Sequence, residues 1–150
     1  MTKIMFICHG NICRSPMGEF ILKDLTMKRG LSDRFYIASC ATSTEEIGNP
    51  VYPPAREKLA QHGISCQRKR AVQLKRSDYS EYDLFLCMDR YNLRNALRIF
   101  GEDPNKKVRM LMDYAGRDAD VDDPWYSGNF DQAFDDIKEG CLGLLEALIQ

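Results

Sequence analysis

The chain has 150 residues, of which 44% are hydrophobic, and a formal net charge of -1. This length suits one domain with its own core, and the balanced charge gives no general attraction to nucleic acid or to an anionic membrane. Because we find no long apolar segment and no signal-peptide pattern, we expect a single domain over residues 1–150 that acts in the cytoplasm without a membrane.

The chain contains six cysteines, several of them in apolar runs. We interpret them as reduced thiols, as expected for a cytoplasmic protein. The two histidines, His9 and His62, do not complete a zinc-binding set with them at a recognisable spacing. The sequence therefore predicts no metal site.

An apolar run over residues 3–8 predicts a parallel strand that is covered on both faces. It leads into Cys8-His9-Gly10-Asn11-Ile12-Cys13-Arg14-Ser15-Pro16, and a helical pattern follows over residues 16–29. The five residues between Cys8 and Arg14 are enough for the backbone to surround a tetrahedral anion with N–H groups at a helix N-terminus. We expect this loop to bind phosphate.

The side chains of this loop suit both phosphate binding and nucleophilic chemistry. Arg14 can make a two-pronged contact with phosphate, and the positive surroundings favour the reactive thiolate of Cys8. Gly10 permits close approach of the backbone, and Asn11 tolerates a left-handed conformation. Ser15 is expected to cap the helix and to donate its hydroxyl to the thiolate. The predicted phosphate-binding residues are His9, Gly10, Asn11, Ile12, Cys13 and Ser15.

The rest of the chain alternates predicted strands and helices. Strands are expected over residues 35–41, 84–88 and 108–112, and helices over 53–62, 92–100 and 130–148, with a short turn capped by Ser77. Polar loops are expected over residues 42–50 and 113–128, and the charged segment 67–76 is interpreted as a solvated connector. This alternation predicts an α/β fold with a parallel sheet between helices, whose ligands bind at the carboxyl ends of the strands.

A phospho-cysteine mechanism also needs a general acid outside the loop, because the leaving oxygen requires a proton. The segment Asp122-Asp123-Pro124-Trp125-Tyr126 offers two carboxylates next to a stiffening proline. Its two aromatic side chains could form the walls of a pocket around a phenyl ring. The spacing alone does not decide whether Asp122 or Asp123 is the general acid.

The chain resembles the low-molecular-weight protein tyrosine phosphatases along nearly its whole length. The matching motifs are Cys8 to Pro16, Ser43-Thr44, Gly48-Asn49-Pro50, Cys87-Met88-Asp89 with Asn92-Leu93, and Asp123-Pro124. The resemblance implies a flavodoxin-like, four-stranded parallel sheet with helices on both faces. It also implies Cys8 as nucleophile, Arg14 as phosphate clamp and Asp123 as general acid and then base.

The same resemblance implies an enzyme without metal or organic cofactor that acts on phosphotyrosine-containing proteins or small aryl phosphates. Asp89 matches an acidic residue near the site, and Cys13 matches a cysteine that forms a disulfide with an oxidised nucleophile in many members. The sequence departs from the family where it places Glu45 and Trp125, and where Arg68 or Lys69 replaces a histidine that supports the loop asparagine. The predicted substrate pocket consists of Glu45, Trp125 and Tyr126.

Three other functions remain open. An arsenate reductase would use the same loop with further cysteines, and Cys13 is compatible with it, although no other cysteine lies in a recognisable resolving motif. Protein arginine phosphatases are similar but tend to have threonine where Ile12 stands. A flavodoxin-like binding module would hold phosphate without any need for Cys8.

Overall fold

The computed structural model of the protein describes residues 1–149. Strands β1 (Thr2–Cys8), β2 (Phe35–Ala41), β3 (Leu84–Cys87) and β4 (Val108–Met110) form one parallel sheet in the order β2-β1-β3-β4. The predicted α/β fold with a four-stranded parallel sheet is confirmed. Among the described residues, no helix is both long and apolar enough to cross a bilayer.

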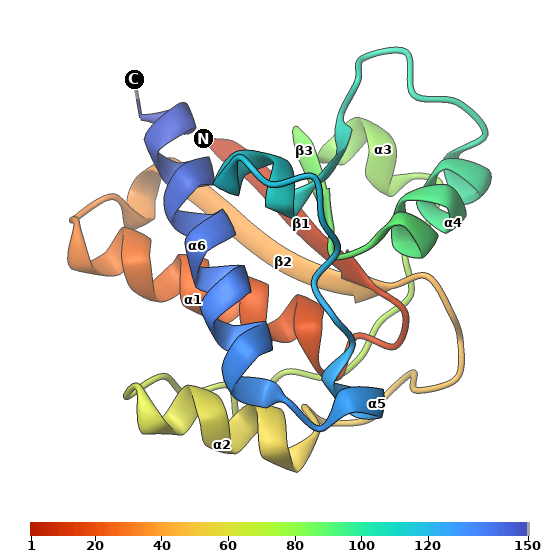
Figure 1. Ribbon diagram of the computed structural model, residues 1–150. Helices are drawn as coiled ribbons and strands as arrows, with labels where there is room; N and C mark the ends of the chain where they lie inside the picture. The colour runs from red at the N-terminus through yellow and green to blue at the C-terminus, as the bar shows by residue number, and fades with distance from the viewer. Residues whose placement is uncertain (150) are drawn as a thin grey trace.

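Helices cover both faces of the sheet (Figure 1). Helices α1 (Arg14–Lys28) and α6 (Phe130–Leu148) pack together on one face, and α2 (Pro53–Gln61) packs against both of them. Helix α4 (Arg90–Phe100) and the short α3 (Asp78–Glu81) lie on the other face. Alternate side chains of β1 supply the two cores, with Phe6 on the α1 side and Met5 on the α4 side. Burial on both faces explains why β1 is continuously apolar.

Two predicted helix starts are wrong by two residues. Helix α1 begins at Arg14 after Cys13, and Ser15 does not cap it, because its hydroxyl lies against the Cys8 sulfur. Helix α4 begins at Arg90 because the Asp89 side chain accepts a hydrogen bond from the Asn92 backbone N–H and closes a capping box. At α1, the expected cap residue Ser15 has its partner outside the helix. At α4, the capping side chain is that of Asp89.

The end of the sheet also differs from the prediction. Strand β4 ends at Met110, and residues 111–115 form the 3-10 helix η2 (Leu111–Ala115) instead of continuing the strand and opening a loop. Leu111 and Met112 are buried there, because α6 approaches closely through its glycines. A Cβ atom on Gly143 would lie 1.9 Å from the Tyr114 carbonyl oxygen. The predicted loop 113–128 also contains the short helix α5 (Pro124–Ser127).

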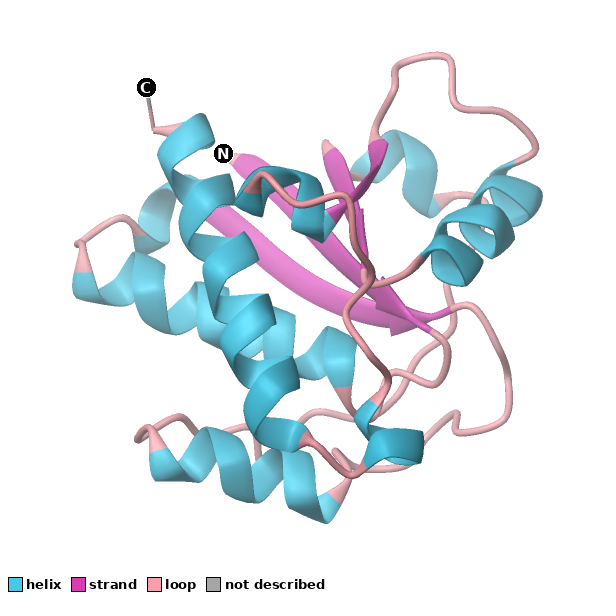
Figure 2. Cartoon of the chain, in the orientation of Figure 1, coloured by secondary structure: helices cyan, strands magenta, loops and turns pink. Residues whose placement is uncertain are grey.

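Two further expectations on the connectors need correction. Ser77 precedes α3 as predicted but makes no side-chain cap; instead Asp78 accepts a hydrogen bond from the Lys75 backbone N–H. Segment 67–76 is a connector, as expected, but Lys69 is largely buried within it. Figure 2 shows loops gathered beyond the arrowheads of the strands, at the edge where the loop after β1 lies.

Candidate active site

The loop between β1 and α1 turns its carbonyl groups outward. The carbonyl of Cys8 accepts a hydrogen bond from the Thr42 backbone N–H at 3.0 Å, and the carbonyl of Ile12 accepts one from Tyr52 at 2.8 Å. Asn11 adopts the left-handed conformation expected of it, with φ of 59°. With carbonyls occupied on the outside, loop amides are free to face the interior, where an anion would bind.

Polar donors converge on the Cys8 sulfur at the floor of this loop. The Asn11 and Ser15 backbone N–H groups donate to Sγ at 3.3 and 3.4 Å, and the Ser15 hydroxyl lies 2.9 Å from it. Hydrogen bonds to the charged form of an acid favour that form. The loop thus surrounds the Cys8 sulfur with hydrogen-bond donors.

Arg14 is held rigidly beside the sulfur. Its side chain is 3% exposed, and Nη1 donates to Asp89 Oδ2 at 2.7 Å and to the Val121 carbonyl at 2.9 Å. Nη2 lies 3.5 Å from Asp123 Oδ2. Burial alone lowers the pKa of Arg14, but the negative charges of Cys8, Asp89 and Asp123 outweigh it and raise that pKa. The guanidinium therefore stays charged next to the anion-binding loop.

Asp123 stands on the other wall of the site, immediately before α5. Its Oδ1 accepts a hydrogen bond from the Trp125 backbone N–H at 3.0 Å, which orients the carboxyl group. The side chain is 28% exposed, and Asp123 lines the same cavity as Cys8 and Arg14. Asp122 is exposed and does not line this cavity. Of the two adjacent carboxyl groups, that of Asp123 is therefore the one that lines the cavity.

The cavity above Cys8 has a volume of about 120 Å³. Trp125 and Tyr126 line it and are 50% and 86% exposed, and the Trp125 ring packs on Tyr52 with centroids 4.7 Å apart. Glu45 lines the same cavity, and its Oε2 lies 3.0 Å from His9 Nε2. The aromatic side chains form walls that a flat ligand could contact.

A larger cavity of about 630 Å³ lies elsewhere, and neither Cys8 nor Arg14 lines it.

A chain of buried polar side chains supports the loop from behind. Asn11 Nδ2 donates to Ser15 Oγ at 2.7 Å and to Ser39 Oγ at 2.9 Å, and Ser39 donates to Glu19 Oε1 at 2.6 Å. Since Ser15 accepts from Asn11, its own proton is available to the Cys8 sulfur. Lys23 Nζ, 2.6 Å from Glu19 Oε2, and Lys69 Nζ, 3.8 Å from Glu19 Oε1, compensate the buried carboxylate.

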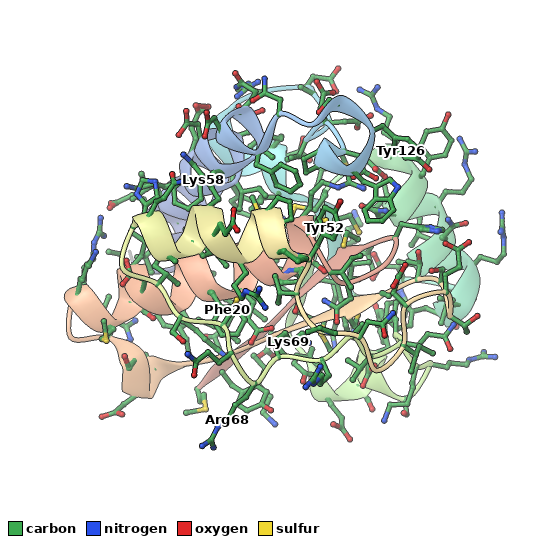
Figure 3. All side chains as sticks on the ribbon, turned by 90° about the horizontal axis from the view of Figure 1, so that it is seen from below. Phe20, Tyr52, Lys58, Arg68, Lys69 and Tyr126 are labelled. Atoms are coloured by element: carbon green, nitrogen blue, oxygen red, sulfur yellow. The ribbon has the colours of Figure 1, made fainter. Side chains whose placement is uncertain are left out.

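The sequence did not identify Ser39 or Glu19 as members of this network. Ser39 lies in a strand and Glu19 in a helix, so neither carries a local signal that separates it from an ordinary surface residue. Arg68 and Lys69 are the two residues that could stand where the family tends to have a histidine. Of these, Lys69 contacts the network, since its Nζ donates to the Ser39 carbonyl at 2.9 Å. Arg68 is exposed and points away from the ribbon, on the opposite side of the molecule from Tyr126 (Figure 3).

We expect the Ser39→Ala variant to lose stability and turnover together. The change leaves a donor of Asn11 and an oxygen of Glu19 without their partner inside the protein, which typically costs about 1–3 kcal/mol. Loosening Asn11 should also lower kcat, because Asn11 orients the Ser15 hydroxyl. Denaturant unfolding and steady-state kinetics measure both effects. Ser43→Ala, which removes a hydroxyl from the neighbouring exposed loop, is the control; equal effects of the two changes would contradict a role for the network.

The predicted loop residues divide into two groups. His9, Gly10, Ile12 and Cys13 line the cavity with Cys8 and Arg14, whereas the Asn11 and Ser15 side chains lie behind it in the polar network. Burial, followed by the negative charge of Cys8, raises the pKa of the Cys13 thiol well above its ordinary value. Within residues 1–149, no group of three His, Cys, Asp or Glu side chains is arranged to hold a metal ion.

Glu46 and Tyr52 complete the surroundings of the cavity and were also not predicted. Glu46 lines the cavity next to Glu45, and Tyr52 supports Trp125 from behind. Adjacency to Glu45 could have indicated Glu46, whereas the position of Tyr52 depends on how α2 packs.

Comparisons with known proteins find relatives over nearly the whole chain. The family model "Low molecular weight phosphotyrosine protein phosphatase" matches residues 3–150. The chain is 36% identical to the low molecular weight protein-tyrosine-phosphatase YfkJ of Bacillus subtilis, and the match covers 99% of this chain and 96% of the relative. It is 35% identical to the low molecular weight phosphotyrosine protein phosphatase of Rattus norvegicus, over 98% of this chain and 93% of the relative.

Solved structures give the same result. The crystal structure of YfkJ superposes with a TM-score of 0.94 and covers 99% of this chain and 94% of that one. A Drosophila arginine phosphatase is 29% identical, with a TM-score of 0.91 and coverage of 99% of each chain. These solved structures therefore share the fold of this chain over nearly its whole length.

Proposed function

Because the chain belongs to the low molecular weight phosphotyrosine protein phosphatase family and is a cysteine-based phosphatase, we propose specific residue roles for its reaction. Cys8 is the nucleophile, Arg14 clamps the phosphate, and Asp123 is the general acid and then the general base. The convergence of two backbone N–H groups and the Ser15 hydroxyl on the Cys8 sulfur carries this proposal, because it favours the thiolate.

The reaction proceeds in two displacements at phosphorus. The Cys8 thiolate forms a bond to phosphorus while the bond to the phenolic oxygen breaks, and protonated Asp123 gives its proton to that oxygen. The Asp123 carboxylate then takes a proton from water as the water oxygen attacks the phospho-cysteine, releasing phosphate and the thiolate. Arg14 and the loop amides that do not donate to the sulfur bind the phosphoryl oxygens throughout, where charge builds up in both transition states.

Phosphotyrosine-containing proteins and small aryl phosphates are the substrates that suit this site. The exposed faces of Trp125 and Tyr126 flank the cavity above Cys8, and an aryl ring can lie between these walls and the loop. We further propose a single domain over residues 1–150 that works in the cytoplasm without nucleic acid or membrane partners. The near-neutral charge of the whole chain supports the last part of this proposal, because it gives no general attraction to polyanions.

Substrate competition tests this function. We expect a phosphotyrosine peptide to be hydrolysed with a higher kcat/KM than the same peptide with phosphoserine or phosphoarginine at that position, because only the tyrosyl group places an aromatic ring against the cavity walls. Release of inorganic phosphate measures the three rates. Faster turnover of the phosphoarginine peptide would instead support an arginine phosphatase, an activity named for a relative of the same fold.

A further inference from the structure

We propose that the mouth of the active site selects phosphotyrosines flanked by lysine or arginine, and that Glu45 and Glu46 are its specificity-determining residues. This inference rests on the proposed function and adds the class of peptide that the enzyme prefers. Two features of the mouth carry it: carboxylates held by hydrogen bonds and exposed aromatic faces, which line the same cavity.

The acidic wall is formed by the loop that follows β2. Glu45 and Glu46 both line the cavity together with Cys8. Glu46 leans over the phosphate-binding loop, since a Cβ atom on Gly10 would lie 3.4 Å from Glu46 Cγ. Its negative charge reaches inside the cavity, where it adds to the burial that raises the pKa of Cys13. A substrate side chain at the mouth therefore meets negative charge.

Both carboxylates are held in place by hydrogen bonds. Glu45 Oε2 lies 3.0 Å from His9 Nε2, and Glu46 Oε2 accepts a hydrogen bond from Asn49 Nδ2 at 2.6 Å. The Glu45 side chain is nevertheless 69% exposed, so a bound peptide can reach it. Groups that are already oriented lose little conformational entropy when they bind a partner.

The aromatic wall suits the same cationic side chains. The rings of Trp125 and Tyr126 are largely exposed, and Tyr52 supports Trp125 from behind. Because Tyr126 is 86% exposed, its ring keeps a free face while the phenyl ring of the substrate lies in the cavity. A lysine ammonium or an arginine guanidinium over that face gains a favourable cation–π interaction. The two walls together therefore favour a positive residue beside the phosphotyrosine.

A negative residue in the substrate would find few partners here. Among the described residues that line the cavity, only Arg14 and His9 can carry a positive charge. Arg14 is buried and bound to Asp89, and His9 is paired with Glu45. Acidic flanks would thus meet the negative charge of Glu46 beside the Glu45–His9 pair, and no free cation among the described lining residues offsets that repulsion.

We expect a modest but measurable preference. Exposed ion pairs are individually weak, so two of them together should favour a basic peptide over an acidic one by about 3- to 10-fold in kcat/KM at low salt. The preference should decrease at high ionic strength, because salt screens exposed charges.

Two phosphotyrosine peptides test the inference, identical except for lysines or glutamates on both sides of the phosphotyrosine. The parent enzyme should prefer the lysine peptide, and the double variant Glu45→Lys with Glu46→Lys should reverse that preference. The matched control is Asp33→Lys with Glu102→Lys, which makes the same change in net charge at exposed positions that do not line the cavity. It should keep the parent preference. Because the ratio of the two peptides is compared within each protein, a loss of folded enzyme cancels.

Each outcome has a definite meaning. Equal rates on the two peptides, or a preference of the parent for glutamate, would overturn the inference and leave the phosphatase function intact. Reversal in the remote control as well would also overturn it, because the effect would then come from net charge alone. Failure to hydrolyse either peptide would overturn the proposed function itself.

Discussion

Replacing Cys8 by serine is expected to abolish phosphotyrosine hydrolysis, with a loss in kcat of more than about 10⁴-fold, because the variant lacks the covalent nucleophile. A serine hydroxyl gives up its proton far less readily than a thiol, so the donors that converge on this position cannot make it reactive. Phosphate should still bind, because Arg14 and the loop amides are unchanged. Release of phosphate from a phosphotyrosine peptide and isothermal titration with inorganic phosphate measure the two properties.

Cys13→Ser is the matched control, since Cys13 lies in the same loop and lines the same cavity. Burial raises the pKa of the Cys13 thiol, so this residue stays protonated at neutral pH and should contribute little as a nucleophile. The control should retain most of the activity. If Cys8→Ser remained active while Cys13→Ser did not, the assignment of the nucleophile would be wrong.

Replacing Asp123 should slow substrates according to their leaving groups. General acid catalysis typically contributes about 10²- to 10⁴-fold, so we expect a loss of that size on a phosphotyrosine peptide and a much smaller loss on nitrophenyl phosphate. The nitrophenolate is already a stable anion and needs little help from a proton. Steady-state kcat for the two substrates measures the difference.

Two different replacements of Asp123 distinguish a role in proton transfer from a structural role. Asp123→Asn keeps an oxygen that can accept the hydrogen bond from the Trp125 backbone N–H but cannot serve as the acid, whereas Asp123→Ala removes both functions. Asp122→Ala is the control, and its activity should be close to that of the parent. Equal slowing of both substrates by Asp123→Asn would count against proton transfer and favour a role in positioning the loop before α5.

The strands and long helices could be predicted because burial leaves a direct pattern in the sequence. The run before Cys8 is apolar on both faces since helices cover both sides of the sheet, and α6 carries a regular apolar stripe. The errors occur where a tertiary contact overrides the local pattern. Leu111 and Met112 are apolar enough for a strand, but the packing of α6 buries them in a 3-10 helix instead.

For the active site, the sequence by itself determined which residues could carry the chemistry. Cys8, Arg14 and the surrounding loop lie within one short segment, so their spacing is preserved in any fold that places a strand before them and a helix after them. The choice of Asp123 as the general acid also came from the sequence, through the family resemblance and the adjacent Pro124. The local segment was therefore enough to identify the residues that we propose as the nucleophile and the phosphate clamp.

Only the tertiary structure decided how those residues are supported and what surrounds them. Ser39 and Glu19 reach Asn11 because β2 and α1 lie beside the loop. Lys23, one turn along α1, pairs with Glu19 at 2.6 Å, and the tertiary structure adds Lys69 at 3.8 Å. Glu46 likewise borders the site only because the loop after β2 closes over Gly10. Such contacts join segments that are distant along the chain, and their hydrogen bonds and charges leave no periodic pattern in the sequence from which they could be predicted.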